Sequence, residues 1–169
     1  MRGKVTWSVK GIAMIGAIVT LGALLWMFSP MSQPTTNLAH VALTPDDKDV
    51  VRIGQSVYAA QCASCHGANL KGQQNWRSRL PNGMLPAPPH DATGHTWHHN
   101  DAYLFGITKY GIETLIGKPY ANAMPAYEDI IPDADIIAAL SYIKSTWPKT
   151  IQQRHDQLNQ QWIKQQSAR

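Results

Sequence analysis

The stretch "CASCH", residues 62–66, contains both cysteines of the 169-residue chain in a Cys-x-x-Cys-His pattern. A bare Cys-x-x-Cys pair also occurs as a redox disulfide in a thioredoxin-like βαβ setting, or as half of a zinc site. Neither setting fits, because no strand patterning flanks the motif and the sequence has no second cysteine pair. With His66 directly after Cys65, the pattern is the attachment signature of haem c.

The spacing has a chemical reason. Two thiols three residues apart at the end of a helix can reach the two vinyl groups of one porphyrin, and the next side chain then lies under the iron. We therefore expect one haem c, attached covalently through Cys62 and Cys65, with His66 as an axial ligand of the iron.

The segment in front of the motif, residues 45–61, is predicted to be a helix. Thr44 is placed to cap it, Pro45 suits its first position, and Asp46 and Asp47 suit its first turn. Its predicted buried face, at a spacing of three and four residues, consists of Val50, Ile53, Gly54, Val57 and Tyr58. A glycine inside a helix suggests a close crossing with another helix.

Two further helices are predicted downstream. The segment 100–110 begins with Asn100 as a possible cap, and Gly111 is placed to end it in a left-handed turn, with Tyr103, Leu104 and Ile107 facing inward. The segment 133–147 has acidic residues at its start and Pro148 after its end. Its predicted stripe consists of Ile136, Leu140, Ile143 and Trp147.

No segment alternates like a strand, so the fold class is predicted to be all-α. Residues 67–99 form a long irregular stretch rich in Gly, Pro and Asn. A loop of that length in a small domain is usually functional or disordered, and a large ligand would give it something to wrap around.

The charges are unevenly distributed along the chain. Residues 32–143 carry seven basic and ten acidic residues, whereas residues 144–169 carry five basic and one acidic residue. A nucleic-acid-binding protein concentrates basic residues on its folded domain. The mildly acidic middle argues against that class.

The first 31 residues are predicted to be a membrane anchor. Residues 11–28 form an eighteen-residue stretch without a charge, preceded by Arg2, Lys4 and Lys10, which predicts a cytoplasmic N-terminus and an exported domain. A cleaved signal peptide remains the alternative, although no Ala-x-Ala site follows Phe28. The predicted organisation is an anchor at 1–31, a linker at 32–43, a domain at 44–148 and a tail at 149–169.

Across residues 45–148 the sequence resembles the class I c-type cytochromes: a helix ending in "CASCHG", a loop, a middle helix, and "AMPAY" before a C-terminal helix. The resemblance implies the class I cytochrome c fold, in which the N- and C-terminal helices cross through a small residue and aromatic side chains. These would be Gly54 and Tyr58 against the helix that carries Leu140 and Tyr142. The segment 85–101 also resembles a bacterial subgroup of small, N-terminally anchored monohaem cytochromes c.

The resemblance also suggests further haem contacts. The second iron ligand of the family is a methionine that usually precedes proline, which here is Met124, and a thioether is a suitable ligand for haem iron. Met84, in the loop, is its main rival outside the N-terminal segment. A proline carbonyl of the family accepts the ring N–H of the iron-bound histidine. Pro86, Pro88 and Pro89 are the candidates here, with Pro88 or Pro89 preferred. Trp76, Arg77 and Arg79 could reach the propionates, or could be surface groups with no such role.

The histidine-rich stretch 90–99, "HDATGHTWHH", leaves three readings open. His95 and His99, on one helical face, could form a second metal site that His98 or His90 completes. Alternatively, one of these residues could replace Met124 on the iron, or they could have structural roles such as hydrogen bonding and packing of Trp97 over the haem edge. The structural reading is preferred, because no carboxylate lies within "HTWHH" and no soft ligand follows it.

The expected function is electron transfer without a small-molecule substrate. We expect a non-enzymatic monohaem carrier on the periplasmic side of the inner membrane, with a quinol-oxidising complex or dehydrogenase as donor and a terminal oxidase as acceptor. The alternatives are a haem subunit of a larger oxidoreductase and a haem enzyme or sensor with an open distal site. The glutamine-rich tail 149–169 is either a marginal helix or partly disordered.

Overall fold

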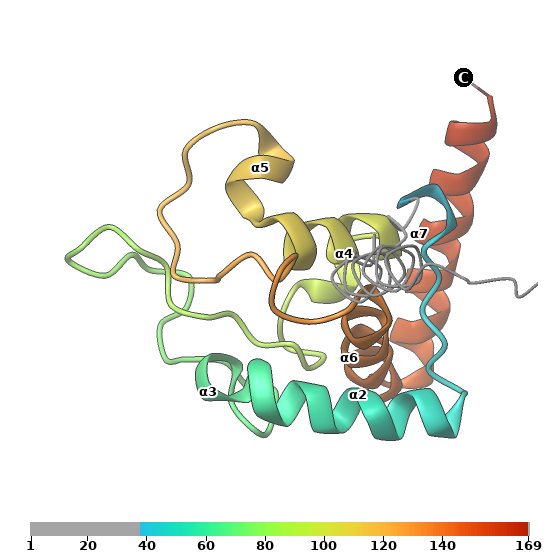
Figure 1. The fold of residues 1–169 in the computed structure, drawn as a ribbon, viewed down its shortest axis with the longest axis horizontal. Coiled ribbons are helices and arrows are strands. Elements are labelled where there is room, and N and C mark those ends of the chain that lie inside the picture. Colours follow the sequence, from blue (N-terminus) through green and yellow to red (C-terminus); the bar gives the residue numbers. More distant parts are fainter. Residues whose placement is uncertain (1–37, 169) are drawn as a thin grey trace, which may run out of the picture. The chain divides into compact units, whose positions relative to one another are not determined.

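The computed structural model describes residues 38–168, and all of the described elements are helices (Figure 1). The chain divides after Thr35, so the described residues all belong to the second of two units, residues 36–169. The α-helices are α2 Lys48–Gln61, α3 Ala63–His66, α4 Asp101–Tyr110, α5 Ile112–Ile116, α6 Asp133–Ser145 and α7 Lys149–Ser167. Two short 3₁₀ helices are η1 Leu38–His40 and η2 Thr96–His98. The all-α prediction is confirmed for this part of the chain.

The helix α2 begins three residues later than the sequence predicts. Its cap is Asp47, whose carboxylate accepts hydrogen bonds from the backbone N–H groups of Asp49 and Val50 at 3.0 and 3.1 Å. The predicted cap, Thr44, instead donates its backbone N–H to Ser141 Oγ of α6 at 3.0 Å. That long-range bond anchors Thr44 to α6, and a turn follows in which the backbone N–H of Asp47 donates to the carbonyl of Thr44 at 3.2 Å. The carboxylate of Asp47 is therefore the side-chain group placed to accept from the free N–H groups of the helix.

The helices α2 and α6 cross directly at Gly54, and in Figure 1 α2 runs below α6. A Cβ atom at Gly54 would overlap the backbone carbonyl group of Ala138 in α6. Tyr58, one turn further along α2, is 2 % exposed and packs at 5.5 Å from the ring of Tyr142. The close crossing predicted from the sequence is confirmed, but Ile53, assigned to the buried face, is 44 % exposed.

The middle helix α4 starts as predicted, because the Asn100 side chain accepts a hydrogen bond from the backbone N–H of Tyr103 at 2.8 Å. Its end differs from the prediction. Gly111 has φ +82° but ψ 158°, which is not the left-handed helical conformation, and α5 follows directly. Phe105, absent from the predicted face, is fully buried. The predicted stripe of α6 is confirmed, since all four residues are buried: Ile136, Leu140, Ile143 and Trp147.

The predicted tail forms the nineteen-residue helix α7, which is packed against the domain. Gln152 is buried and donates to the carbonyl group of Trp147 at 2.9 Å. The buried ammonium group of Lys144 in α6 pairs with Asp156 of α7 at 2.6 Å. The helical alternative for the tail is therefore correct, and its polar contacts bind it to α6.

His155 is the most buried side chain of α7, with no exposed surface. Its Nε2 donates to the carbonyl oxygen of His99 at 2.7 Å and lies 3.6 Å from the carboxylate of Asp101. Burial lowers the pKa of His155, an effect that the Asp101 carboxylate opposes. The Asn159 side chain bridges to Asp101 at 3.0 Å, so a buried polar network connects α7 to the start of α4.

The segment in front of α2 also belongs to the packed domain. Val41 and Leu43, which were predicted to lie in a linker, are buried in the core. The backbone N–H of Leu43 donates to the Asp101 carboxylate at 2.9 Å. No helix among residues 38–168 is long and apolar enough to cross a membrane. The predicted anchor, residues 1–31, lies outside the described residues.

Candidate haem site

The cysteine motif lies at the junction between α2 and α3. Cys62 is half-buried, Cys65 is exposed, and both are free thiols. Burial, with a contribution from Cys65, raises the pKa of the Cys62 thiol to about 11. Two tyrosine hydroxyls hold the backbone on either side: Tyr58 donates to the carbonyl of Gly67, and Tyr127 donates to the carbonyl of Gln61, both at 2.8 Å.

His66, at the end of α3, is 8 % exposed, and its ring is oriented by the loop. Its Nδ1 lies 2.9 Å from the carbonyl oxygen of Pro88, which can only accept, so Nδ1 carries the proton and donates. Nε2 is therefore the nitrogen with a free lone pair. Burial lowers the pKa of His66, although the bond to Pro88 opposes this shift. A neutral imidazole with one fixed N–H is the form that binds a metal ion.

Gly72 allows the loop to bring this carbonyl group to the histidine. It has φ +65°, and a Cβ atom there would lie 2.5 Å from the carbonyl carbon of Pro88. Its backbone N–H donates to the carbonyl of His66 at 2.8 Å. The loop therefore contacts itself at a point where only glycine fits, and this contact positions the acceptor of the His66 ring.

His90 lies directly against His66. Its ring stacks on the His66 ring with centroids 4.0 Å apart, and its Nδ1 lies 2.9 Å from Thr96 Oγ1. Its backbone carbonyl accepts from the indole N–H of Trp147 at 2.8 Å. Burial, followed by the proximity of His66 and His95, places the pKa of His90 well below its usual value. His90 is thus a neutral ring that packs against His66.

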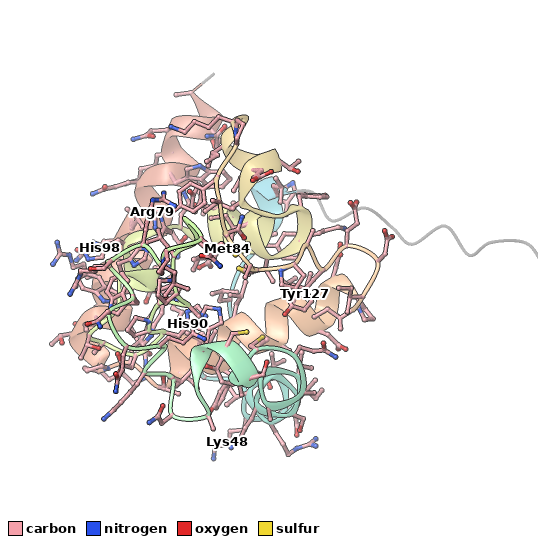
Figure 2. All side chains as sticks on the ribbon, turned by 90° about the vertical axis from the view of Figure 1, so that its left-hand side faces the viewer. Lys48, Arg79, Met84, His90, His98 and Tyr127 are labelled. Atoms are coloured by element: carbon pink, nitrogen blue, oxygen red, sulfur yellow. The ribbon has the colours of Figure 1, made fainter. Side chains whose placement is uncertain are left out.

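Met124 is half-buried and packs against the hydrophobic core. Its backbone N–H donates to the side-chain oxygen of Asn122 at 3.0 Å, which fixes the turn before it. Its rival Met84 is also half-buried. Two long loops, residues 67–100 and 117–132, connect α3 to α4 and α5 to α6. Figure 2 shows Met84, His90 and Tyr127 around the middle of the face that carries these loops.

The predicted propionate contacts lie in the first of these loops. Trp76 is half-buried and stacks on His95 with centroids 5.3 Å apart, and the Arg77 guanidinium lies 4.2 Å from the Trp76 ring centroid. Arg79 is exposed, donates to the carbonyl of Gly83 at 2.6 Å, and lies 5.5 Å from the ring centroid of Tyr120. None of these three forms an ion pair with a described residue.

The histidine cluster does not form a multi-ligand metal site in the part of the chain that the structure describes. No group of three or more His, Cys, Asp or Glu side chains is arranged there to hold a metal ion. The rings stack on aromatic neighbours instead, as with His98 on Trp97 at 3.7 Å and His99 on Tyr103 at 4.6 Å. These contacts agree with the structural reading of the stretch.

The donor set fits a covalently attached haem. Two free thiols are three positions apart at a helix end, the adjacent imidazole has a fixed proton on Nδ1, and a thioether is packed inward on a separate loop. Trp97 Nε1 is buried without an acceptor among residues 38–168, so one donor remains for an acidic group such as a propionate. This donor was missed from the sequence, where Trp97 was assigned only a packing role.

The model of one protein family, described as cytochrome c, matches residues 51–147, which is more than half of the chain. The chain belongs to the cytochrome c family. Members of this family typically carry electrons on a covalently attached haem c and are not enzymes, so the motif at Cys62 and Cys65 is the attachment site expected of this cytochrome c. A curated relative, the cytochrome c-555 of Prosthecochloris aestuarii, is 31% identical over 77 residues, which covers 42% of this chain and 78% of the relative. Comparison with solved structures gives no significant match.

Proposed function

We propose that the protein is a monohaem electron carrier with His66 and Met124 as iron ligands, tethered to the inner membrane with its haem domain in the periplasm. The observation that carries the proposal is the hydrogen bond of 2.9 Å from His66 Nδ1 to Pro88, beside two free thiols at the correct spacing. It leaves Nε2 free to bind iron and makes the imidazole a stronger donor. The bound haem would supply a single-electron couple between ferric and ferrous iron.

The chain's own residues would limit the structural change that accompanies electron transfer. Cys62 and Cys65 would attach the group at two points, and the backbone on either side of the motif is held by the hydroxyls of Tyr58 and Tyr127. The His66 ring is restrained by Pro88 and by its stacking on His90. A site held from several directions reorganises little when its charge changes, which is the property an electron carrier needs.

Met124 is the preferred second ligand because it belongs to the loop that returns to the core before α6, and its side chain packs against that core. A methionine and histidine pair raises the reduction potential of haem iron. Met84 is the matched control, because it is also half-buried and lies in the other long loop.

The ferric absorption spectrum of the haem-loaded protein tests this assignment. The weak red band from methionine sulfur to iron is expected in the wild type and in Met84→Leu, and is expected to be lost in Met124→Leu. Retention of the band in Met124→Leu with loss in Met84→Leu would transfer the role to Met84. Absence of the band in the wild type, together with ready binding of carbon monoxide, would support an enzyme or sensor with an open distal site.

The tether and the partners rest on the sequence. The uncharged stretch 11–28 after three basic residues supports a single span with the domain outside the cytoplasm, and the partners would be a quinol-oxidising complex or dehydrogenase and a terminal oxidase. Membrane fractionation of the full chain, with a variant that lacks residues 1–31 as control, tests the tether. Recovery of the protein from the soluble periplasmic fraction, with its N-terminal segment cleaved off, would contradict the tether. Stable co-purification with a larger oxidoreductase would favour the subunit alternative over a free carrier.

A further inference from the structure

The turn η2 organises two layered stacks, each built from an arginine, a tryptophan and a histidine. In the first stack, Arg77 lies 4.2 Å from the ring centroid of Trp76, and Trp76 stacks on His95 at 5.3 Å with an interplanar angle of 11°. In the second, Arg154 of α7 lies 5.1 Å from the Trp97 ring centroid, and Trp97 stacks on His98 at 3.7 Å. Both stacks therefore meet on four consecutive residues, 95–98.

Neither guanidinium group has an acidic partner among the described residues. The ion pairs of residues 38–168 involve Arg52, Lys109, Lys144, Lys149 and His155, and omit Arg77 and Arg154. Acidic side chains are also scarce nearby in sequence, since residues 67–100 contain three basic residues and a single acid, Asp91. Most of the remaining acids lie at residues 46–49 and 128–135. The two stacks thus form a local cationic surface on a domain that is mildly acidic.

Stacking prepares these arginines for binding carboxylates. A guanidinium held over an aromatic ring has lost much of its side-chain freedom, while its N–H groups remain available for a two-point contact with a carboxylate. Next to the second stack lies an open cavity of about 220 Å³, lined by Trp97, His98, Arg154, Gln157, Leu158 and Gln161. Its amide and guanidinium donors suit an acidic side chain.

The surface is connected to the proposed iron ligand by a short series of contacts. Thr96, at the centre of the turn, lies 2.9 Å from His90 Nδ1, and the His90 ring stacks on His66 at 4.0 Å. A molecule docked on the stacks would therefore lie close to His66, the proposed iron ligand.

We propose that the two stacks, Arg77–Trp76–His95 and Arg154–Trp97–His98, form the docking surface for acidic side chains of a redox partner protein. This inference rests on the proposed function. A protein is favoured over a lipid surface because a bilayer covering this face would hinder a partner's access to the haem. The face also has few apolar side chains to insert, with Leu80 as the large exposed residue of the loop. Complementary charge at such a rim acts mainly on the rate of encounter.

The test measures the rate at which the reduced, haem-loaded protein gives one electron to ferricyanide, which becomes ferrocyanide. At ~10 mM ionic strength, removing one positive charge roughly 10 Å from a trivalent anion should slow the encounter about threefold to fivefold. We expect this decrease in Arg77→Gln and in Arg154→Gln, with little effect at high salt. The matched control is Arg52→Gln on α2, an exposed arginine that pairs with Asp49. A cationic oxidant, tris(phenanthroline)cobalt(III), should react faster with the two variants.

A binding measurement separates the class of partner. Calorimetric titration with poly-L-glutamate should give a salt-dependent association that is weakened in Arg77→Gln and Arg154→Gln and unchanged in Arg52→Gln. Arg77→Lys keeps the charge but loses the planar stack, so it should retain the ferricyanide rate and still bind polyglutamate more weakly.

Equal rates and equal polyglutamate binding in all variants would overturn the proposal. Sedimentation with phosphatidylglycerol vesicles that is lost in the arginine variants, without any polyglutamate binding, would overturn the protein partner in favour of a lipid surface. Failure of the proposed function gives a different result, because a protein that attaches no haem shows no electron transfer with either oxidant.

Discussion

Replacing Gly54 by alanine would test the helix crossing on which the domain is built. A Cβ atom there overlaps the carbonyl group of Ala138 and comes within 3.0 Å of the backbone nitrogen of Ala139. These obstacles are helix backbone, so they cannot rotate away as a flexible side chain would, and α2 must move away from α6.

The size of the effect follows from two opposing contributions. Overpacking a core costs about 1–3 kcal/mol, and the rigid obstacle places Gly54→Ala at the upper end, about 3 kcal/mol. Replacing a glycine inside a helix by alanine stabilises the helix by about 1 kcal/mol. The free energy of unfolding should therefore fall by about 2 kcal/mol, which for a domain of this size lowers the melting temperature by roughly 6–10 °C.

Thermal and urea unfolding of the haem-loaded protein, followed by far-ultraviolet circular dichroism, measure this change. Gln55→Ala is the matched control, because the next residue of α2 is exposed and its replacement should change the free energy of unfolding by less than about 0.5 kcal/mol. A melting temperature of Gly54→Ala that equals or exceeds that of the wild type would show that the crossing is looser than described and would refute the reasoning.

Three further changes probe the polar contacts and the loop. Because burial keeps the pKa of His155 below its unfolded value of about 6.5, the free energy of unfolding should be highest above that pH and fall on acidification, by at most about 1.4 kcal/mol per pH unit. In His155→Gln the urea midpoint should depend less on pH than in the wild type, and an unchanged dependence would contradict this. Asp101→Asn should lower the free energy of unfolding by about 2–3 kcal/mol in urea titrations, since the new amide turns a donor toward the N–H of Leu43 or toward the neighbouring amide; equal stability would argue against the buried network. Gly72→Ala should displace the Pro88 carbonyl that accepts from His66, the proposed iron ligand, and so raise the reduction potential in voltammetry. Gly83→Ala, at a similar φ of +81° but with nothing within 4 Å, should leave the potential unchanged, and equal potentials for the two variants would count against the positioning role.

Local sequence was sufficient for much of the fold and for the motif. The three-and-four spacing of apolar residues predicted the helices α2, α4 and α6, and Gly54 indicated the crossing, because these features depend on residues that are near one another in the chain. The Cys-x-x-Cys-His pattern is also local, so the expectation of a covalent haem required no knowledge of tertiary structure. The family match over residues 51–147 agrees with that expectation.

Tertiary structure decided which of several equivalent groups is used. Pro86, Pro88 and Pro89 are alike in sequence, and only the contact of the loop with Gly72 selects the carbonyl of Pro88 for the His66 ring. The cap of α2 is Asp47 and not the predicted Thr44, because the backbone N–H of Thr44 is bonded to a side chain 97 residues away.

The tail and the histidine-rich stretch depended on tertiary structure in the same way. The helix formed by residues 149–167 packs on the domain partly through His155, which donates to the carbonyl of His99 and lies near the carboxylate of Asp101. Local helix propensity carries no information about such distant partners. Only the tertiary structure brings Trp76 to the His95 ring and Arg154 to the Trp97 ring. Local patterns determine helices and covalent motifs, whereas long-range contacts, which a linear sequence does not contain, determine how the side chains between them are used.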